Sequence, residues 1–210
     1  MILKEITTAG KNWAQSSKTD RCWHSICVTP TGRIIAGSDR FIWYSDDNGI
    51  NWTRSNTPDT AWPSLCVTPT GRIIAGGSSE AVAIAGIWYS DDNGTKWTLS
   101  DTTDELWECL CITPTGRIVA GTKSTGILYS DDSGINWVQS NKTDGYWSSI
   151  CVTPTGRIIA GSGWYNRVSV GIWYSDPEYT AVNPKYLDQN GAKEIVTQFK
   201  AYCDSLVGGV

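Results

Sequence analysis

The sequence predicts an all-β fold built from four tandem copies of one small unit, and three observations support this prediction. A heptapeptide, Cys27-Val-Thr-Pro-Thr-Gly-Arg33, returns three times with little change, after 39, 45 and 40 residues. A second motif, Ser45-Asp-Asp-Asn-Gly-Ile-Asn-Trp52, returns at residues 90–97 and 130–137. Apolar residues show no helical period before residue 187. Repetition at this spacing indicates duplication of one supersecondary unit.

Each unit is predicted to contain four short antiparallel strands, a to d. In the clearest copies, strand a covers residues 147–153, strand b 157–160, strand c 126–130 and strand d 136–139. Short β-branched and aromatic runs alternate there with Gly, Pro, Asn and Asp, which is typical of strands joined by tight turns. Four antiparallel strands in about 40–45 residues match one blade of a β-propeller.

The two ends of the repeat array predict how a ring would close. Gly10-Lys-Asn-Trp13 matches Gly49-Ile-Asn-Trp52 and is therefore a strand d without the rest of its blade. The last unit reaches residues 171–176 and has no strand d of its own. Pairing the two would close a four-bladed β-propeller over residues 1–183 and remove two exposed sheet edges. The alternative is an open array that completes a larger ring by oligomerising or by exchanging strands.

Residues 184–210 form a second segment, which is predicted to be a short amphipathic α-helix. Apolar residues recur there with the three- and four-residue spacing of a heptad seam: Ala192, Ile195, Phe199, Tyr202 and Leu206. A helix of this length is marginal alone. We therefore expect it to dock on the propeller or to serve assembly, with residues 187–206 as a possible homo-oligomer contact.

The second motif, Ser-x-Asp-x-Gly-x-x-Trp, resembles the Asp-box, or BNR repeat, of sialidase-like β-propellers. The matching residues are Ser45, Asp47, Gly49 and Trp52; Ser90, Asp92, Gly94 and Trp97; and Ser130, Asp132, Gly134 and Trp137. Gly10, Trp13 and Ser175 resemble the remains of a fourth, divided box. The resemblance implies that the boxes are structural turns on the face away from any active site. The chemistry agrees, because Asp accepts backbone N–H bonds, Gly adopts positive φ and Trp packs between sheets.

The resemblance does not extend to the catalytic residues of sialidases. The arginines at 33, 72, 117 and 157 belong to the repeat, and no pair of differently tuned carboxylates can be singled out. We therefore expect no enzymatic activity and no catalytic residues. A sialidase-type glycoside hydrolase remains an alternative.

Composition and charge exclude several other classes. With one His and no zinc-like spacing among seven Cys, neither a metal site nor another cofactor is expected. A net charge of −4 with scattered Lys and Arg argues against a nucleic-acid partner. No apolar run is long enough for a membrane span, and no signal peptide is evident, so synthesis in the cytoplasm is expected.

The face that carries the d–a and b–c loops is the predicted ligand-binding face, because the loops vary there while the other turns repeat. Each strand a begins with Trp, and Asp stands three residues earlier. Trp can stack on a sugar ring and Asp can accept from its hydroxyls; the alternative is that Trp packs between blades and Asp caps a turn. Trp164 and Tyr165 lie in a long b–c loop, and Trp164 is the one Trp outside the repeat. The ligand-binding candidates are Trp23, Trp62, Trp107, Trp147, Asp20, Asp59, Asp104, Asp144, Trp164 and Tyr165.

The predicted function is a noncatalytic, lectin-like module that binds a carbohydrate or another cell-surface ligand. Residues 185–191, together with the helix that follows, resemble a segment of tail and baseplate-associated structural proteins of phages that infect Gram-positive bacteria. This resemblance implies a phage or prophage tail protein and a location on the virion. The first alternative is a structural or protein–protein interaction unit that oligomerises.

Overall fold

The computed structural model describes residues 11–78, 85–102, 105–163 and 170–177, and within these ranges the chain is all β. The strands form four antiparallel sheets, which we call blades 1 to 4. Blade 1 contains β1 (Trp23–Val28), β2 (Ile34–Ser38), β3 (Ile42–Ser45) and β4 (Thr53–Arg54). Blade 2 contains β5 (Ala61–Val67), β6 (Ile73–Ser78), β7 (Gly86–Ser90) and β8 (Thr98–Leu99). Blade 3 contains β9 (Trp107–Ile112), β10 (Ile118–Thr122), β11 (Ile127–Ser130) and β12 (Val138–Gln139). Blade 4 contains β13 (Trp147–Val152), β14 (Ile158–Ser162) and β15 (Gly171–Tyr174).

Each blade is an up-and-down meander with strands in sequence order, as the repeat predicts. The Pro-Thr-Gly turn joins the first two strands. Gly32 has a φ of 88°, in the left-handed region that favours glycine, and its N–H donates to the Thr29 carbonyl oxygen at 2.9 Å. The outer strands β4, β8 and β12 have only two residues each, shorter than the predicted strand d. The turn that precedes them takes up the remaining residues of the motif.

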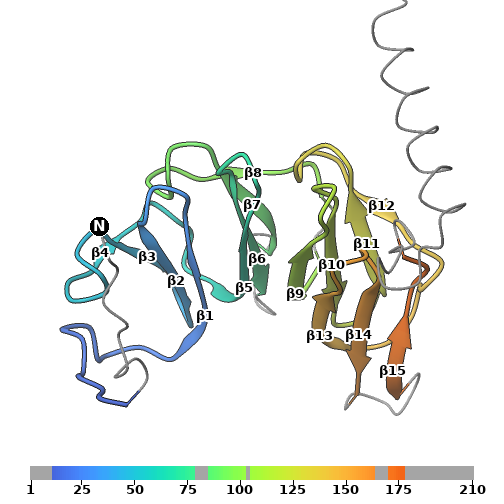
Figure 1. Ribbon diagram of the computed structural model, residues 1–210, viewed down its shortest axis with the longest axis horizontal. Coiled ribbons are helices and arrows are strands. Elements are labelled where there is room, and N and C mark those ends of the chain that lie inside the picture. The colour runs from blue at the N-terminus through green and yellow to red at the C-terminus, as the bar shows by residue number, and fades with distance from the viewer. Residues whose placement is uncertain (1–10, 79–84, 103–104, 164–169, 178–210) are drawn as a thin grey trace, which may run out of the picture.

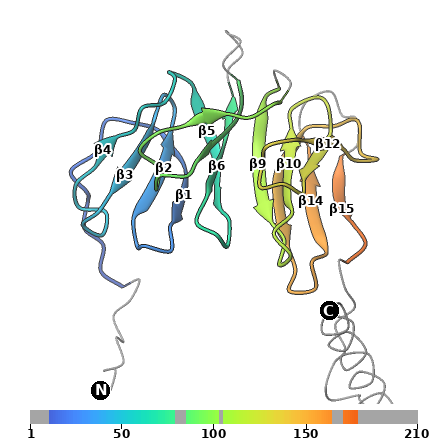
Figure 2. The same cartoon turned by 90° about the horizontal axis from the view of Figure 1, so that it is seen from above.

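The blades stand side by side in an open arc, with blade 1 at one end and blade 4 at the other (Figures 1 and 2). The hydrophobic core lies between neighbouring blades rather than within one of them. Between blades 1 and 2, for example, Ile35 and Ile42 pack with Trp62, Leu65 and Trp97. Similar clusters join blade 2 to blade 3 and blade 3 to blade 4. This arrangement of four small sheets is consistent with a β-propeller.

The structure does not show the predicted closure of the ring. Blade 4 has three strands in the described part of the chain, and 87% of the Trp13 surface is exposed. Closure by the N-terminal strand therefore stays a prediction. The predicted C-terminal helix, residues 184–210, lies outside the described residues. Within those residues, no helix has the length and apolar character that crossing a bilayer requires.

Candidate functional site

The three complete Asp-boxes are closed turns whose polar groups bind one another. In the first box, Asp47 Oδ1 accepts from the backbone N–H of Ile50 at 3.1 Å and of Asn51 at 2.8 Å. Ser45 Oγ donates to the same carboxylate at 2.8 Å and accepts the Gly49 N–H at 2.9 Å. The second and third boxes repeat these contacts through Ser90, Asp92 and Gly94, and through Ser130, Asp132 and Gly134.

The hydrogen bonds within the boxes change the pKa of the Asp carboxyl groups. Burial alone would raise the pKa of Asp132, but hydrogen bonds from Asn136, Ser130 and Ile135 outweigh it and lower that pKa to about 2. The indole N–H of each box Trp donates to the carbonyl oxygen of its box Gly, at 3.1 Å in Trp52 and at 3.2 Å in both Trp97 and Trp137. These contacts hold each turn together, which is the structural role that the resemblance implied; the Trp52 indole N–H also donates to Ser16 Oγ at 2.7 Å.

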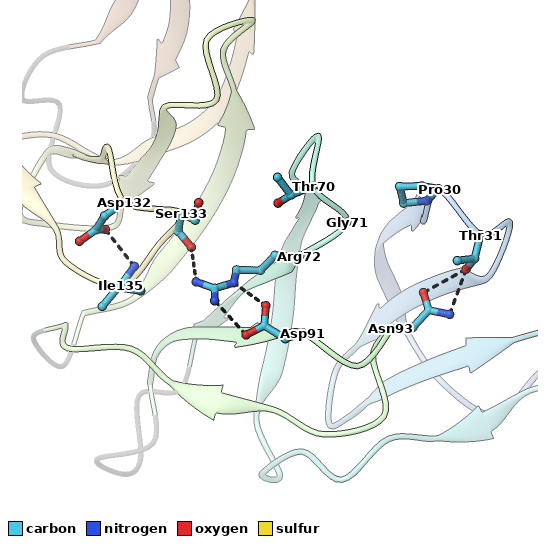
Figure 3. A pocket seen from close by; sticks show the side chains of 10 residues that line it. All are labelled: Pro30, Thr31, Thr70, Gly71, Arg72, Asp91, Asn93, Asp132, Ser133 and Ile135. Atoms are coloured by element: carbon cyan, nitrogen blue, oxygen red, sulfur yellow. Dashed lines mark hydrogen bonds and ion pairs between the residues drawn. The ribbon is translucent and has the colours of Figure 1, made fainter. Parts of the chain in front are cut away.

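The repeated arginines tie neighbouring boxes together. A hollow of about 560 Å³ lies on the Asp-box face. Figure 3 shows Arg72 among the side chains that line it. Arg72 Nε and Nη2 donate to the two Asp91 oxygens at 2.6 and 2.8 Å, and Nη1 donates to the Ser133 carbonyl oxygen of the next blade at 3.1 Å. Arg33 makes the equivalent contacts between blades 1 and 2, to Asp46 and to Asn93. These guanidinium groups are used between blades and do not form a ligand-binding triad.

The strand-a tryptophans are not the sugar platform that the sequence suggested. Trp62, Trp107 and Trp147 are completely buried between blades, so their rings cannot stack on a ligand, and the ligand-contact prediction for these three is wrong. They are buried because each of these rings packs against the preceding blade. Trp23 is 38% exposed because no described blade precedes it, and it packs against Trp52 with ring centroids 5.7 Å apart.

The three described aspartates that precede these Trp residues are exposed, and two of them form ion pairs with Lys or Arg side chains. Asp20 accepts from Lys18 at 2.7 Å, which holds the pKa of this carboxyl below its usual value. Asp59 forms a two-pronged ion pair with Arg40, which lowers its pKa in the same way. Asp144 is exposed and its backbone carbonyl oxygen accepts the Trp147 indole N–H at 2.7 Å. The remaining candidates, Asp104, Trp164 and Tyr165, lie outside the described residues.

A different position on the same face is singled out by the strand register. In every blade the pairing of the first two strands shifts next to the strand-a Trp, at a β-bulge. The residue after the Trp lies at this bulge and differs in every blade: His24, Pro63, Glu108 and Ser148. Bulges redirect a side chain and are common beside binding sites. This position therefore combines a fixed backbone with a variable side chain.

Glu108 connects three blades in what we call the Glu108 cluster, formed by Ser78, Glu108 and Tyr146. Ser78 Oγ of blade 2 donates to Glu108 Oε1 at 3.3 Å. The Tyr146 hydroxyl, which precedes β13 of blade 4, donates to Oε2 at 3.4 Å. Burial raises the pKa of Tyr146, and the neighbouring Glu108 carboxylate raises it further. The phenol is therefore a neutral hydrogen-bond donor at physiological pH.

A hollow of about 730 Å³ adjoins this cluster, and Tyr146 lines both. We call it the loop-face hollow, and its other lining residues include Lys123, Ser148, Ser162 and Ile172. Ser162 Oγ is buried there and has no hydrogen-bond partner among the described residues. The hollow thus offers an apolar floor with a cation, hydroxyls and an aromatic ring, and its volume lies in the usual range for small-ligand sites.

The sequence interpretation missed Glu108 and Tyr146 because it followed the conspicuous repeated Trp. The available signal was the contrast between the identical Trp positions and the four different residues that follow them. In a chain of near-identical repeats, packing between blades does not dictate the residue at a position that changes in each copy. The side chain at such a position is available to contact a ligand.

The cysteines at the repeated strand-a position are free thiols: Cys111 is buried, Cys27 and Cys66 are half-buried, and Cys151 is exposed. Burial raises the pKa of Cys27 and of Cys111 to about 12 and raises that of Cys66 well above its usual value. No group of His, Cys, Asp or Glu side chains in the described ranges could hold a metal ion.

Comparison with known proteins supports a BNR-type propeller. The family model of the BNR/Asp-box repeat matches residues 43–54. The fold resembles the extracellular domain of the putative hybrid two-component system BT4673 from B. thetaiotaomicron, with 12% identity over 77% of this chain and 22% of that one, and a TM-score of 0.60. It also resembles the computationally designed Ika4 protein, with 9% identity over 79% of this chain and 98% of that one, and a TM-score of 0.59. A third neighbour is virginiamycin B lyase from Staphylococcus aureus, with 17% identity over 77% of this chain and 57% of that one, and a TM-score of 0.57.

At these identities the likeness shows the fold alone. The chain spans about a fifth of the length of the BT4673 domain, and none of the curated proteins matches it. The neighbours give no support to the resemblance to phage tail and baseplate proteins, and the residues that carry it lie outside the described part. Enzymes are present among the neighbours, so the fold does not decide whether this protein is one.

Proposed function

We propose that this protein is a noncatalytic module that binds a carbohydrate or another hydroxyl-rich surface ligand on its loop face. The observation that carries the proposal is the Glu108 cluster beside the loop-face hollow. On this face the side chain at the β-bulge position differs from blade to blade. On the Asp-box face the polar groups are hydrogen-bonded to one another.

The chemistry of the hollow suits a sugar. A carboxylate accepts hydrogen bonds from hydroxyl groups, and Glu108 keeps acceptor capacity after its contacts with Ser78 and Tyr146. The Ser162 hydroxyl has no described partner and could donate to a ligand oxygen. The Tyr146 ring offers an apolar surface against which the C–H groups of a pyranose can pack.

The carboxyl groups support binding rather than glycoside hydrolysis. A retaining or inverting glycosidase needs one carboxylic acid with a raised pKa. Among the described residues, each carboxyl group whose pKa clearly shifts has it lowered: Asp20, Asp47, Asp59, Asp92 and Asp132. Turnover of a fluorogenic sialoside that survives repurification and is lost on Glu108→Gln would favour the sialidase alternative instead.

The test is a glycan array followed by titration of the best ligand, with tryptophan fluorescence as the readout. Glu108→Gln and Tyr146→Ala should each weaken binding about tenfold or more, because each removes a hydrogen bond to or from a charged group. Glu105→Gln is the matched control, since it changes the same residue type nearby outside the cluster, and it should leave affinity unchanged. Binding of no glycan, or equal effects of all three variants, would contradict the proposal.

A further inference from the structure

The three interfaces inside the chain are copies of one contact between two kinds of blade face. The leading face of a blade points to the next blade and carries residues such as Ile42, Tyr44 and Cys27 in blade 1. The trailing face points to the previous blade and carries residues such as Trp62, Leu65 and Val67 in blade 2. Because the repeat fixes both surfaces, the leading face of any blade fits the trailing face of any other.

Among the described residues, no blade packs against the trailing face of blade 1. Its residues occupy the positions of Trp62, Leu65 and Val67, yet Trp23 is 38%, Ile26 66% and Val28 59% exposed. Trp23 and Ile26 line a hollow of about 630 Å³ that Trp52 also lines. In the inner blades the same positions are buried or half-buried, so the exposure reflects a missing neighbour and not a different surface.

The leading face of blade 4, which is complementary, likewise has no described blade packed against it. Ile172, at the position of the fully buried Ile42 and Ile87, is 80% exposed, and Tyr174 is 74% exposed. Cys151 is exposed here, whereas its counterpart Cys111 is buried. Gly161 adds independent evidence. A Cβ on Gly37, Gly76 or Gly121 would meet the Trp residue of the next blade within 3.0 Å, but on Gly161 the nearest atom is Ser149 Cβ at 3.9 Å.

A hollow of about 410 Å³ between blades 3 and 4 marks the place of a box tryptophan. Its apolar lining is Val119, Ile127, Ile158 and Ala160. These residues occupy the repeat positions that pack around Trp97 between blades 1 and 2 and around Trp137 between blades 2 and 3. The described part of blade 4 supplies no strand d and no box Trp to fill this space.

The segment that fits this place already lies against blade 1 in the correct register. The Ser17 N–H donates to the Ile50 carbonyl oxygen at 3.1 Å, just as the Asp101 N–H, four residues after Trp97, donates to Ile135 of the following blade at 3.2 Å. Lys18 lies over the Trp43 ring of blade 1 as Lys142 lies over the Trp173 ring of blade 4. Relative to blade 1, residues 13–18 therefore lie where the outer strand of a preceding blade, and the loop after it, would lie.

We infer that the leading face of blade 4 docks on the trailing face of blade 1 of a second copy of this chain, and that Trp13 of that copy fills the hollow between blades 3 and 4. The two faces of one copy lie at opposite ends of the arc, and both views show them apart (Figures 1 and 2). Bringing them together within one chain would require all three close-packed interfaces to change. Gly161 and Ile172 also line the loop-face hollow, so the docked copy would form part of the wall of the proposed ligand site. The contact is head-to-tail, so it closes into a ring of copies or continues as a fibre.

The test is solution mass across a wide range of protein concentration. The wild-type chain should have at least twice the mass of one 23.0 kDa copy. Gly161→Ala should reduce this to one copy, because its Cβ would meet Trp23 of the partner copy, while far-ultraviolet circular dichroism stays unchanged. Ile26→Asp and Ile172→Asp should do the same from the two opposite faces. Val138→Asp, an exposed apolar residue of β12 away from both faces, is the control and should keep the wild-type mass.

Mixing the two Asp variants gives the decisive result. Each variant keeps one intact face, so an equal mixture of Ile26→Asp and Ile172→Asp should form a two-copy complex, although neither associates alone. A monomeric wild type would overturn the inference and favour closure within one chain. An oligomer that withstands all three variants would overturn it as well, and would point to the C-terminal segment.

Discussion

Aspartate residues in the box turns show how one side chain can define a local fold. Asp132 accepts hydrogen bonds from two backbone N–H groups, a serine hydroxyl and the Asn136 side chain. The sequence predicted this role correctly because the interactions are local and depend only on spacing. It could not predict which exposed carboxylate is tied to a cation, because the Asp59–Arg40 pair joins residues 19 positions apart on different loops.

Replacing Asp132 with Ala should lower the free energy of unfolding at pH 7 by about 1–3 kcal/mol, because four donors lose their acceptor. The folded-state pKa is lowered, so this stabilisation is present above pH 4 and is lost as pH falls towards 2. Urea unfolding at pH 7, 4 and 2.5 measures both effects. Asp101→Asn, at an exposed position outside the boxes, should change little; equal losses in the two variants would contradict the prediction.

Thiol labelling tests the burial of the cysteine row. Cys66 should react with iodoacetamide at pH 8 only after unfolding, because burial raises its pKa and leaves almost no thiolate. Cys22 is exposed and should react at once in the native protein. Peptide mass spectrometry distinguishes the two sites. Rapid native labelling of Cys66 would show that the strand-a row is open to solvent.

Strands and turns were largely predictable, because the short β-branched and aromatic runs and the Pro-Thr-Gly and Asp-box turns recur in register. Strand b was placed at residues 157–160 and lies at Ile158–Ser162, and strand d was predicted to be longer than the two residues observed. The β-bulge beside each strand-a Trp was not predictable. It arises where the Trp is drawn into the space between blades, and that is a contact across sheets and not a property of one strand.

The strand-b glycines are required by the same contact. A Cβ on Gly121 would lie 2.6 Å from both Cys109 Sγ and Trp147 Cβ. Gly121→Ala should therefore lower the free energy of unfolding by about 1–3 kcal/mol through overpacking. Gly163→Ala, with no atom within 4 Å of the added methyl group, is the control. Thermal unfolding compares them, and similar stabilities would mean that neighbouring blades can separate at little cost.

At the scale of the whole molecule, the described residues do not show the predicted closure of the ring, because no described blade covers either end face. The sequence predicted both the orphan strand and the incomplete blade, and it left closure and assembly as alternatives. It could not decide between them because the local contacts are the same in both. The difference lies in the accumulated rotation from blade to blade, which short-range patterns do not encode.

If the end faces join two copies, folding and assembly are coupled. The melting temperature of the wild type should then rise with protein concentration, because association stabilises the folded chain by mass action. Gly161→Ala should melt at a temperature that does not depend on concentration. Differential scanning fluorimetry over a dilution series measures this. A wild type whose melting temperature stays constant would contradict the coupling.

The repeated interface also bears on how such a gene can change. Since every junction joins the same two surfaces, an in-frame duplication or loss of one repeat unit would leave each remaining junction with a matching partner. Unequal recombination between near-identical repeats could therefore alter the number of blades without any compensating substitution. The bulge residues would travel with their blades, so each such event would also rearrange the order of the side chains that face a ligand.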